Sequence, residues 1–122
     1  MPRLTWMVLC FSFGTFNTAA DTNCDLVLGK RMFQKCVICH SINDDGVHSI
    51  GPNLHGLLER PVGKVEGFKF SREMRKSEES WTAEYLDTFL ESPMAMYPRT
   101  TMAFAGLKKP ADRAAVICYM AK

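Results

Sequence analysis

No stretch of this 122-residue chain limits its possible structures more strongly than Cys36-Val37-Ile38-Cys39-His40. On a helical turn, two thiols that are three residues apart lie on the same face, one turn apart. They are placed to bind the two vinyl groups of a single haem, while the adjacent imidazole reaches its iron. The C-x-x-C part alone is also typical of redox dithiols and of half a zinc site. The histidine favours haem attachment, and a second iron ligand elsewhere in the chain would strengthen that interpretation.

The second candidate ligand is Met102, in the stretch Tyr97-Pro98-Arg99-Thr100-Thr101-Met102-Ala103-Phe104-Ala105-Gly106. A thioether is a soft ligand that stabilises ferrous iron, and a His/Met pair raises the reduction potential. The remaining histidines, His48 and His55, lie in a loop region rich in glycine and proline. We expect them to form local hydrogen bonds and not to bind iron. A thioredoxin-like or zinc-binding chain would need a βαβ pattern or a second Cys/His pair, and the sequence has neither.

The spacing of apolar residues predicts an all-α fold, because no segment has the pattern of a sustained strand. Ala115, Val116 and Tyr119 are expected on the inward face of the last helix, which leaves Arg113 exposed to solvent. Five helices are predicted. The first is capped by Asp21 or Asn23 and leads into the haem motif, and a short second one begins near Ser71 and covers the charge-rich stretch 73–79. The others are one over 82–91, a short one from Ser92-Pro93 to Pro98, and a last one from Lys109-Pro110 onward.

The first 20 residues have the composition of a secretory signal peptide. Arg3 gives a positive start, residues 4–16 are mostly apolar, and Thr18-Ala19-Ala20 offers small residues for cleavage. An uncleaved anchor is the alternative, but the apolar run is shorter than the roughly 20 residues that span a bilayer. We therefore expect a signal peptide over 1–20 and one domain over 21–122. The formal charge is only +2, without a basic block, so a nucleic-acid partner is not expected.

Taken together, these motifs resemble class I c-type cytochromes of the mitochondrial cytochrome c and bacterial cytochrome c2 type. The resemblance covers roughly residues 24–122, which makes it far more specific than C-x-x-C-H alone. The residues that carry it are Gly29, Phe33, Cys36, Cys39, His40, the loop Gly51-Pro52-Asn53-Leu54-His55-Gly56, Arg60, Gly63, Trp81, Leu90, Pro93, Pro98, Thr100, Met102, Phe104, Gly106, Arg113 and Tyr119.

The resemblance implies four to five helices wrapped around one haem c, bound covalently through Cys36 and Cys39. The first and last helices would cross at Gly29. His40 and Met102 would be the axial iron ligands. The carbonyl of Pro52 would accept the hydrogen bond of the His40 N–H, and Arg60 and Trp81 would hold a propionate. Thr100 and Phe104 are also expected to bind the cofactor.

The implied function is that of a periplasmic one-electron carrier and not an enzyme, because iron with six ligands leaves no place for a substrate. We expect a monomer whose donor and acceptor are redox proteins, with membrane contact only through redox complexes or an uncleaved leader. Two alternatives stay open. One is a dedicated cytochrome subunit of a periplasmic dehydrogenase, which an exposed apolar patch at Met94–Met96 would support. The other is a haem enzyme or gas-binding protein with a labile Met102.

The sequence departs from the family pattern in two respects. Phe89 and Phe70 stand where the family usually has tyrosines near the haem, and Met74 replaces a buried asparagine. The lysines around the exposed haem edge are also fewer, since Met94, Ala95 and Thr101 occupy three of their positions while Lys108 and Lys109 remain. Fewer polar donors predict a drier haem site, and fewer lysines weaken the expectation of an acidic partner surface.

If the terminal helices cross at Gly29, Cys24 and Cys118 lie on neighbouring parts of them. In an oxidising compartment they could form a disulfide. The alternative is two separate buried thiols, and the sequence does not decide between the two, because disulfide formation depends on the separation of the Cα atoms.

Overall fold

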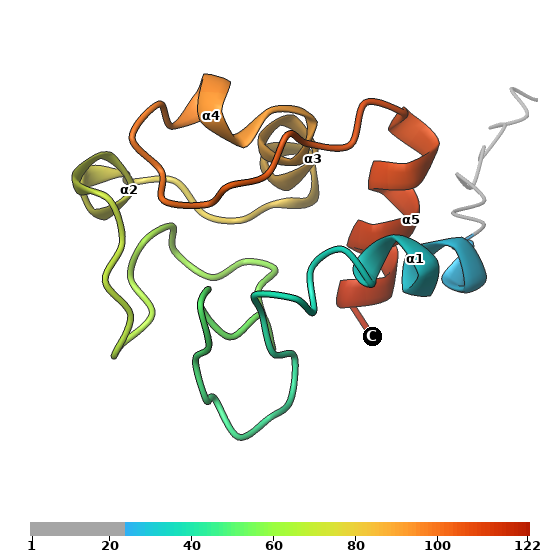
Figure 1. Cartoon of the computed structure of the whole chain (residues 1–122), viewed down its shortest axis with the longest axis horizontal. Coiled ribbons are helices and arrows are strands. Elements are labelled where there is room, and N and C mark those ends of the chain that lie inside the picture. Colours follow the sequence, from blue (N-terminus) through green and yellow to red (C-terminus); the bar gives the residue numbers. More distant parts are fainter. Residues whose placement is uncertain (1–23) are drawn as a thin grey trace, which may run out of the picture.

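The computed structural model describes residues 24–122, in which short helices lie around the periphery and long loops connect them (Figure 1). No strand is found in this range, only an isolated bridge between Pro61 and Ser80. The predicted all-α class is therefore confirmed. The predicted leader, 1–20, lies outside the described residues. The helices are α1 (Leu26–Phe33), α2 (Arg72–Lys76), α3 (Ala83–Glu91), α4 (Pro93–Met96) and α5 (Pro110–Met120).

Local sequence determines where these helices begin. The Asp25 carboxylate accepts a hydrogen bond from the Leu28 N–H at 2.8 Å, and the Ser71 and Thr82 hydroxyls cap α2 and α3 in the same way. Such caps satisfy backbone donors that have no partner within the helix. The N-cap of α1 is thus Asp25, later in the chain than the predicted caps Asp21 and Asn23, which lie outside the described residues. A proline opens both α4 and α5, where its missing N–H has no consequence.

The first two helices are shorter than predicted. α1 ends at Phe33, and consecutive turns follow it, in which the Cys36 N–H donates to the Phe33 carbonyl and the His40 N–H to the Cys36 carbonyl, both at 2.8 Å. The C-x-x-C-H motif therefore lies on helix-like turns and not on a regular helix. α2 ends at Lys76 instead of 79, because the backbone of Ser77 is extended. Within residues 24–122, no helix is long and apolar enough to cross a membrane.

The terminal helices α1 and α5 pack directly on each other (Figure 1). A Cβ atom added to Gly29 would lie 2.7 Å from the Tyr119 Cβ and closer still to the backbone oxygen of Ala115. The Phe33 and Tyr119 rings pack beside this contact, with their centroids 5.3 Å apart. The predicted crossing at Gly29 is confirmed, because only a residue without a side chain permits this approach.

A disulfide joins Cys24 to Cys118 at the outer end of the same helix pair, with a Cα–Cα separation of 5.9 Å. That separation falls in the usual range for disulfides. The pairing that the sequence left open is therefore the one present in the structure. Because the bridge connects residues 94 positions apart, it lowers the conformational entropy of the unfolded chain. In the loop-closure model, this stabilises the folded protein by about 4–5 kcal/mol.

Arg113 is buried, so the prediction that it is exposed to solvent was wrong. Its Nε–H donates to the Asp87 carboxylate on α3 at 2.8 Å, and its guanidinium also donates to the Leu107 carbonyl at 2.9 Å. The hydrogen bond with Asp87 raises the pKa of Arg113 above its ordinary value. Periodicity could not reveal this role, because the partner lies on another helix. The contacts tie α5 both to α3 and to the segment that follows Met102.

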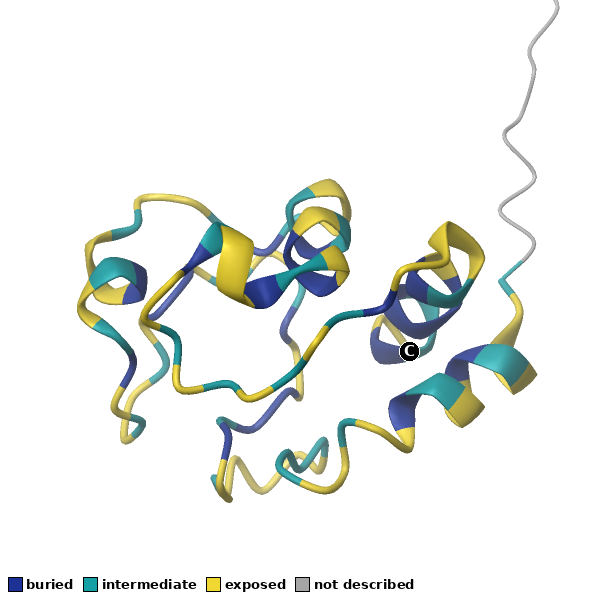
Figure 2. Cartoon of the chain, turned by 45° about the horizontal axis from the view of Figure 1, so that its top comes forward, coloured by how far each residue is buried: buried dark blue, intermediate teal, exposed yellow. Residues whose placement is uncertain are grey.

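Each helix of the described range, 24–122, carries buried positions as well as exposed ones (Figure 2). The most buried side chains include Phe33 of α1, Leu86 of α3 and Val116 of α5. These residues belong to one hydrophobic cluster that also includes buried residues of the loops, such as Val62. The helices therefore enclose a shared interior, and the cavity described below opens within it.

Replacing Gly29 with alanine tests the helix crossing. Alanine would normally stabilise a helix interior by about 1 kcal/mol over glycine. Here its methyl group would overlap backbone and Cβ atoms of α5, and such overpacking typically costs about 1–3 kcal/mol. Because the overlapped backbone atoms cannot move aside, we expect the upper part of that range, about 2–3 kcal/mol, and hence a net loss of about 1–2 kcal/mol in guanidinium unfolding. The exposed neighbour substitution Lys30→Ala should change little, and equal stability of Gly29→Ala and wild type would contradict the crossing.

Candidate functional site

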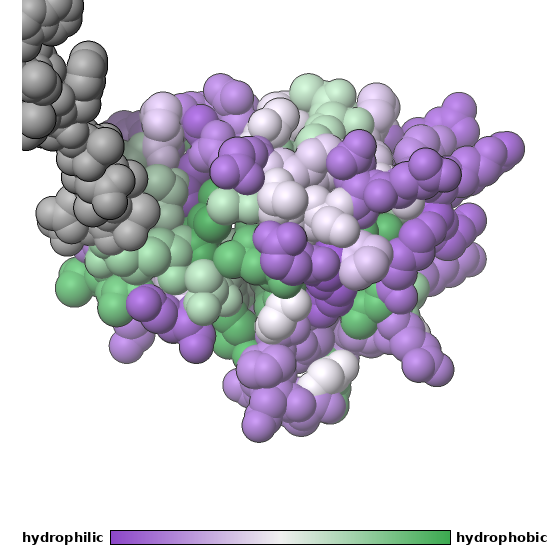
Figure 3. Space-filling model, turned by 180° about the vertical axis from the view of Figure 1, so that it is seen from behind, coloured by the Kyte–Doolittle hydropathy of each residue, from purple (hydrophilic) through white to green (hydrophobic). Residues whose placement is uncertain are grey.

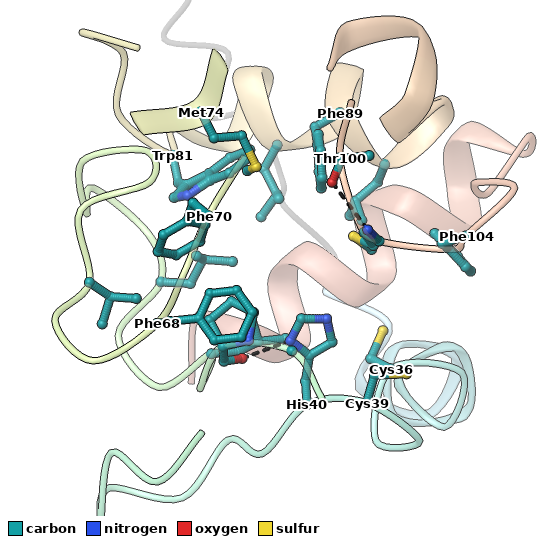
Figure 4. Close-up of a pocket in the computed structure, with 18 of the residues that line it drawn as sticks. Cys36, Cys39, His40, Phe68, Phe70, Met74, Trp81, Phe89, Thr100 and Phe104 are labelled. Carbon is teal, nitrogen blue, oxygen red and sulfur yellow. Dashed lines mark hydrogen bonds between the residues drawn. The ribbon is translucent and has the colours of Figure 1, made fainter. Parts of the chain in front are cut away.

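A largely apolar cavity lies between the loops and the inner faces of the helices (Figure 4). Its volume is about 210 Å³, far above the roughly 10–15 Å³ that one buried water needs. His40, Cys36 and Cys39 lie on one side, while Thr100 and Phe104 lie on the opposite side. All the residues that the sequence nominated for cofactor binding line this one cavity: Cys36, Cys39, His40, Pro52, Arg60, Trp81, Thr100, Met102 and Phe104.

The orientation of His40 is determined by a hydrogen bond from its Nδ1 to the Pro52 carbonyl, at 2.7 Å (Figure 4). A carbonyl only accepts, so Nδ1 carries the proton and Nε2 keeps a free lone pair, as in a metal-binding histidine. Burial lowers the pKa of His40 below its ordinary value, against the opposing effect of the Pro52 hydrogen bond. The imidazole is therefore neutral at pH 7, which is the form that binds iron.

Gly51 provides the space that the His40 ring occupies. A Cβ atom at this position would lie 2.7 Å from the ring Nδ1 and 2.8 Å from Nε2. Gly51 is buried, and its N–H donates to the Cys39 carbonyl at 2.7 Å. The backbone around Gly51 therefore packs against the imidazole and the attachment motif together.

Asn53 holds the proximal loop in place from inside. Its buried amide donates to the Ser41 hydroxyl and to the Asn43 carbonyl, both at 2.9 Å. The Asn53 N–H in turn donates to Nδ1 of His48, whose Nε2 hydrogen-bonds to the Glu66 carbonyl. His48 is thus a structural group with both ring nitrogens engaged, and neither His48 nor the exposed His55 lines the cavity.

Cys36 and Cys39 are the free cysteines of residues 24–122, and both are half-buried at the cavity edge. Burial, followed by the proximity of Cys39, raises the pKa of the Cys36 thiol to about 11. In redox-active C-x-x-C motifs the thiol pKa is lowered instead, so that a thiolate is available at neutral pH. The environment of Cys36 therefore does not match that of a dithiol oxidoreductase.

Met102 reaches the cavity from a loop that is anchored on both sides. Its N–H donates to the Thr100 hydroxyl at 3.2 Å, and further along the Leu107 N–H donates to the Leu90 carbonyl at 2.7 Å. Between them, Gly106 has a φ of +93° and approaches the Glu91 backbone so closely that no side chain would fit. These contacts hold the thioether-bearing segment against the end of α3.

Arg60 is a half-buried cation at the cavity wall. Its guanidinium donates to the Asn53 carbonyl at 3.0 Å and to the His55 carbonyl at 3.3 Å. No carboxylate of residues 24–122 forms an ion pair with it, and burial lowers its pKa from the ordinary value. A cation without an acidic partner fits a cofactor that brings its own carboxylates, as haem does with its propionates.

The aromatic wall contains no hydroxyl near the centre of the cavity. Phe70, Met74 and Phe89 are all buried and line it together with Trp81 (Figure 4). Neither Tyr85 nor Tyr97 lines the cavity, and their two hydroxyls hydrogen-bond to each other at 2.7 Å. Burial and this bond raise the pKa of Tyr85 to about 12. The expectation of a drier pocket agrees with this placement.

These residues fit a covalently bound haem. The cavity is apolar, it has two thiols at its edge, and a neutral imidazole and a thioether line it. The family model for cytochrome c matches residues 26–122.

This chain belongs to the cytochrome c family. A c-type cytochrome, cyt cy, of Rhodobacter capsulatus is 45% identical over 97 residues, which cover 79% of this chain and 48% of that protein. The chain thus spans about half the length of this relative. Cytochrome c2 of Afifella marina is 38% identical over 100 residues, which cover 79% of this chain and 81% of that protein. Cytochrome c of Kluyveromyces lactis is 38% identical over 95 residues, which cover 77% of this chain and 86% of that protein.

Family membership identifies the cofactor as haem c, attached covalently through cysteines, and the role as electron transfer to redox partners. In this cytochrome, Cys36 and Cys39 are the cysteines available for that attachment in the described range, because Cys24 and Cys118 are paired.

Sequence reasoning missed some of the residues that shape the site. Gly51 was noted only as a loop residue, although the chain must lack a side chain there. The feature of the sequence that could have revealed this role is the position of Gly51 next to Pro52, the expected acceptor of the His40 N–H. Ile50 was not singled out, yet it is 77% exposed at the cavity edge. An apolar patch at Met94–Met96 would support the alternative of a dehydrogenase subunit; Met94 is exposed, but Met96 packs against the core.

Replacing Gly51 with alanine tests its role beside the imidazole. The methyl group would overlap the His40 ring and push it from the Pro52 carbonyl, so the matured protein should lose about 1–3 kcal/mol in guanidinium unfolding. Ser49→Ala, an exposed change in the same loop, is the matched control. A Gly51→Ala protein with the stability of the Ser49→Ala control would show that the ring does not need this space.

Proposed function

We propose that this cytochrome is an exported one-electron carrier in which His40 and Met102 bind the iron of one haem c. The observation that carries the proposal is that these two side chains, from opposite ends of the domain sequence, line the same apolar cavity as the two free cysteines. When bound, the haem iron supplies a one-electron couple. Two protein ligands leave no coordination position for a substrate, so we infer a carrier and not a catalyst.

The chain contributes two iron ligands and an apolar environment with a polar edge to this one-electron redox couple. His40 presents Nε2 as the proximal ligand, because Pro52 holds its other nitrogen. Met102 offers a soft sulfur, which favours ferrous iron and a high potential. The surrounding apolar side chains exclude water, and Arg60 with Trp81 provides a polar edge for the propionates.

Replacing Met102 with alanine tests the ligand assignment. Wild-type ferric protein should have a sulfur-to-iron charge-transfer band in the near infrared, and Met102→Ala should lose it. The midpoint potential of the variant should fall by on the order of 0.1 V, a part of the roughly 0.8 V range that axial ligands span. Met94→Ala removes an exposed methionine and should keep both band and potential. Persistence of the band in Met102→Ala would assign the sulfur ligand to another methionine.

We propose the periplasm as the site of action. The signal-like composition of residues 1–20 supports export. The Cys24–Cys118 disulfide supports it independently, because such bonds persist in oxidising compartments.

Mass spectrometry of protein from the periplasmic fraction tests this location. The unreduced protein should begin at Asp21, carry one haem and have no thiol that reacts with an alkylating reagent. After reduction, Cys24 and Cys118 should each take up one alkyl group. Recovery of a chain that begins at Met1 in the membrane fraction would instead support an uncleaved anchor.

A further inference from the structure

The cavity opens to solvent between two segments. Five of the residues that line it are exposed: Lys35 and Ile50 on the side of the attachment motif, Thr101 and Ala103 on the side of Met102, and Pro61. We call the first four of these residues the mouth. Cys36, Cys39, Met102 and Phe104 are half-buried between them. The mouth is therefore the place where the candidate ligands and attachment groups lie nearest to solvent.

Large exposed apolar side chains lie in the two segments that carry Lys35 and Ile50. Ile38 is 73% exposed, Val47 is 60% exposed and Val37 is 47% exposed, and Ile50 belongs to the mouth itself. We call Val37, Ile38, Val47 and Ile50 the apolar rim. They account for four of the seven large hydrophobic residues that are exposed between residues 24 and 122.

Backbone contacts place the two halves of the apolar rim side by side. The Gly51 N–H donates to the Cys39 carbonyl at 2.7 Å, and the Ser41 hydroxyl donates to the Val47 carbonyl. Residues 47–51 therefore run beside residues 39–41. Figure 3 shows that hydrophobic residues also gather around a hollow on the rear face of the molecule, among polar residues. Clustered apolar surface of this kind marks contact sites on soluble proteins.

Charge is almost absent from the mouth. Lys35 is its only charged residue, and the nearby loop carries the exposed carboxylates Asp44 and Asp45. Lys108, which the resemblance placed near the haem edge, donates to the Glu91 carbonyl at 2.6 Å. Counting Lys108 and Lys109 with Lys35, an acidic partner would meet three lysines and two carboxylates, whose charges nearly cancel. A partner with an uncharged, apolar contact surface is the complementary one.

We propose that this cytochrome exchanges electrons through the mouth with a redox protein whose contact surface is apolar and nearly uncharged, seated on the apolar rim. The inference rests on the proposed function and adds the chemistry of the partner to it. Association of this kind is not steered by charge, so it is slower than that of oppositely charged partners and insensitive to ionic strength. Burial of the apolar rim supplies the attraction.

Adsorption on alkanethiol monolayers gives a direct test. The matured holoprotein is applied to monolayers ending in mixed methyl and hydroxyl groups or in carboxylates, at about 0.01 M and about 1 M salt, where the Debye length is roughly 30 Å and 3 Å. Surface plasmon resonance measures the bound amount, and voltammetry measures the electroactive fraction. We expect binding to the uncharged layer at both salt concentrations, with most of the bound protein electroactive.

The variant pair makes the test specific. Ile38→Lys/Ile50→Lys places two charges on the apolar rim, and Leu26→Lys/Val27→Lys places two on exposed apolar positions of α1. The first should lose at least about tenfold in affinity for the uncharged layer, and the second should bind as wild type does. Equal loss in both variants, or wild-type binding that prefers carboxylates and disappears at high salt, would overturn the proposal.

Two further measurements identify other occupants. Sedimentation that finds a dimer dissociated by Ile38→Lys/Ile50→Lys would assign the rim to a second copy of this chain. Binding to vesicles of uncharged phosphatidylcholine that the same variant abolishes would assign it to lipid. Either result overturns the partner proposed. A reversible couple with small soluble mediators is measured separately, so that failure of the carrier function is distinguished from failure of the docking surface.

Discussion

The hydrogen bond from His40 to the Pro52 carbonyl is the contact on which the whole site depends. It determines which ring nitrogen carries the proton, and so which one is free for iron. The bond requires a close approach of the loop, which Gly51 permits by having no side chain. It also requires a loop that does not move, and Asn53 provides this by hydrogen-bonding back to residues 41–43.

The helix pair α1 and α5 provides the frame in which this site is held. Gly29 brings the two helices into contact, and the Cys24–Cys118 disulfide joins their outer ends. Arg113 then connects α5 to α3 and to the Leu107 carbonyl, which lies beyond Met102. Through these contacts the segment that carries Cys36 and His40 is positioned relative to the segment that carries Met102, although they lie far apart in the sequence.

The sequence predicted the helices and the cavity residues well, where the signal was local or came from the family resemblance. Caps and prolines located the starts of α2 to α5, and the motifs nominated residues that line one cavity. It failed where a long-range partner decides the outcome. Arg113 is buried because Asp87 faces it from another helix, and no periodicity records that pairing. The apolar rim was not predicted for the same reason, because residues 47–51 lie beside residues 39–41 only when the loop folds back.

The central claim is that an imidazole and a thioether, brought together by this fold, bind one haem iron between them. X-ray absorption at the iron edge of the matured ferric protein tests it most directly, because sulfur and nitrogen scatter differently. The account predicts a single sulfur scatterer alongside nitrogen neighbours in wild type. A first coordination shell made only of nitrogen and oxygen would contradict it.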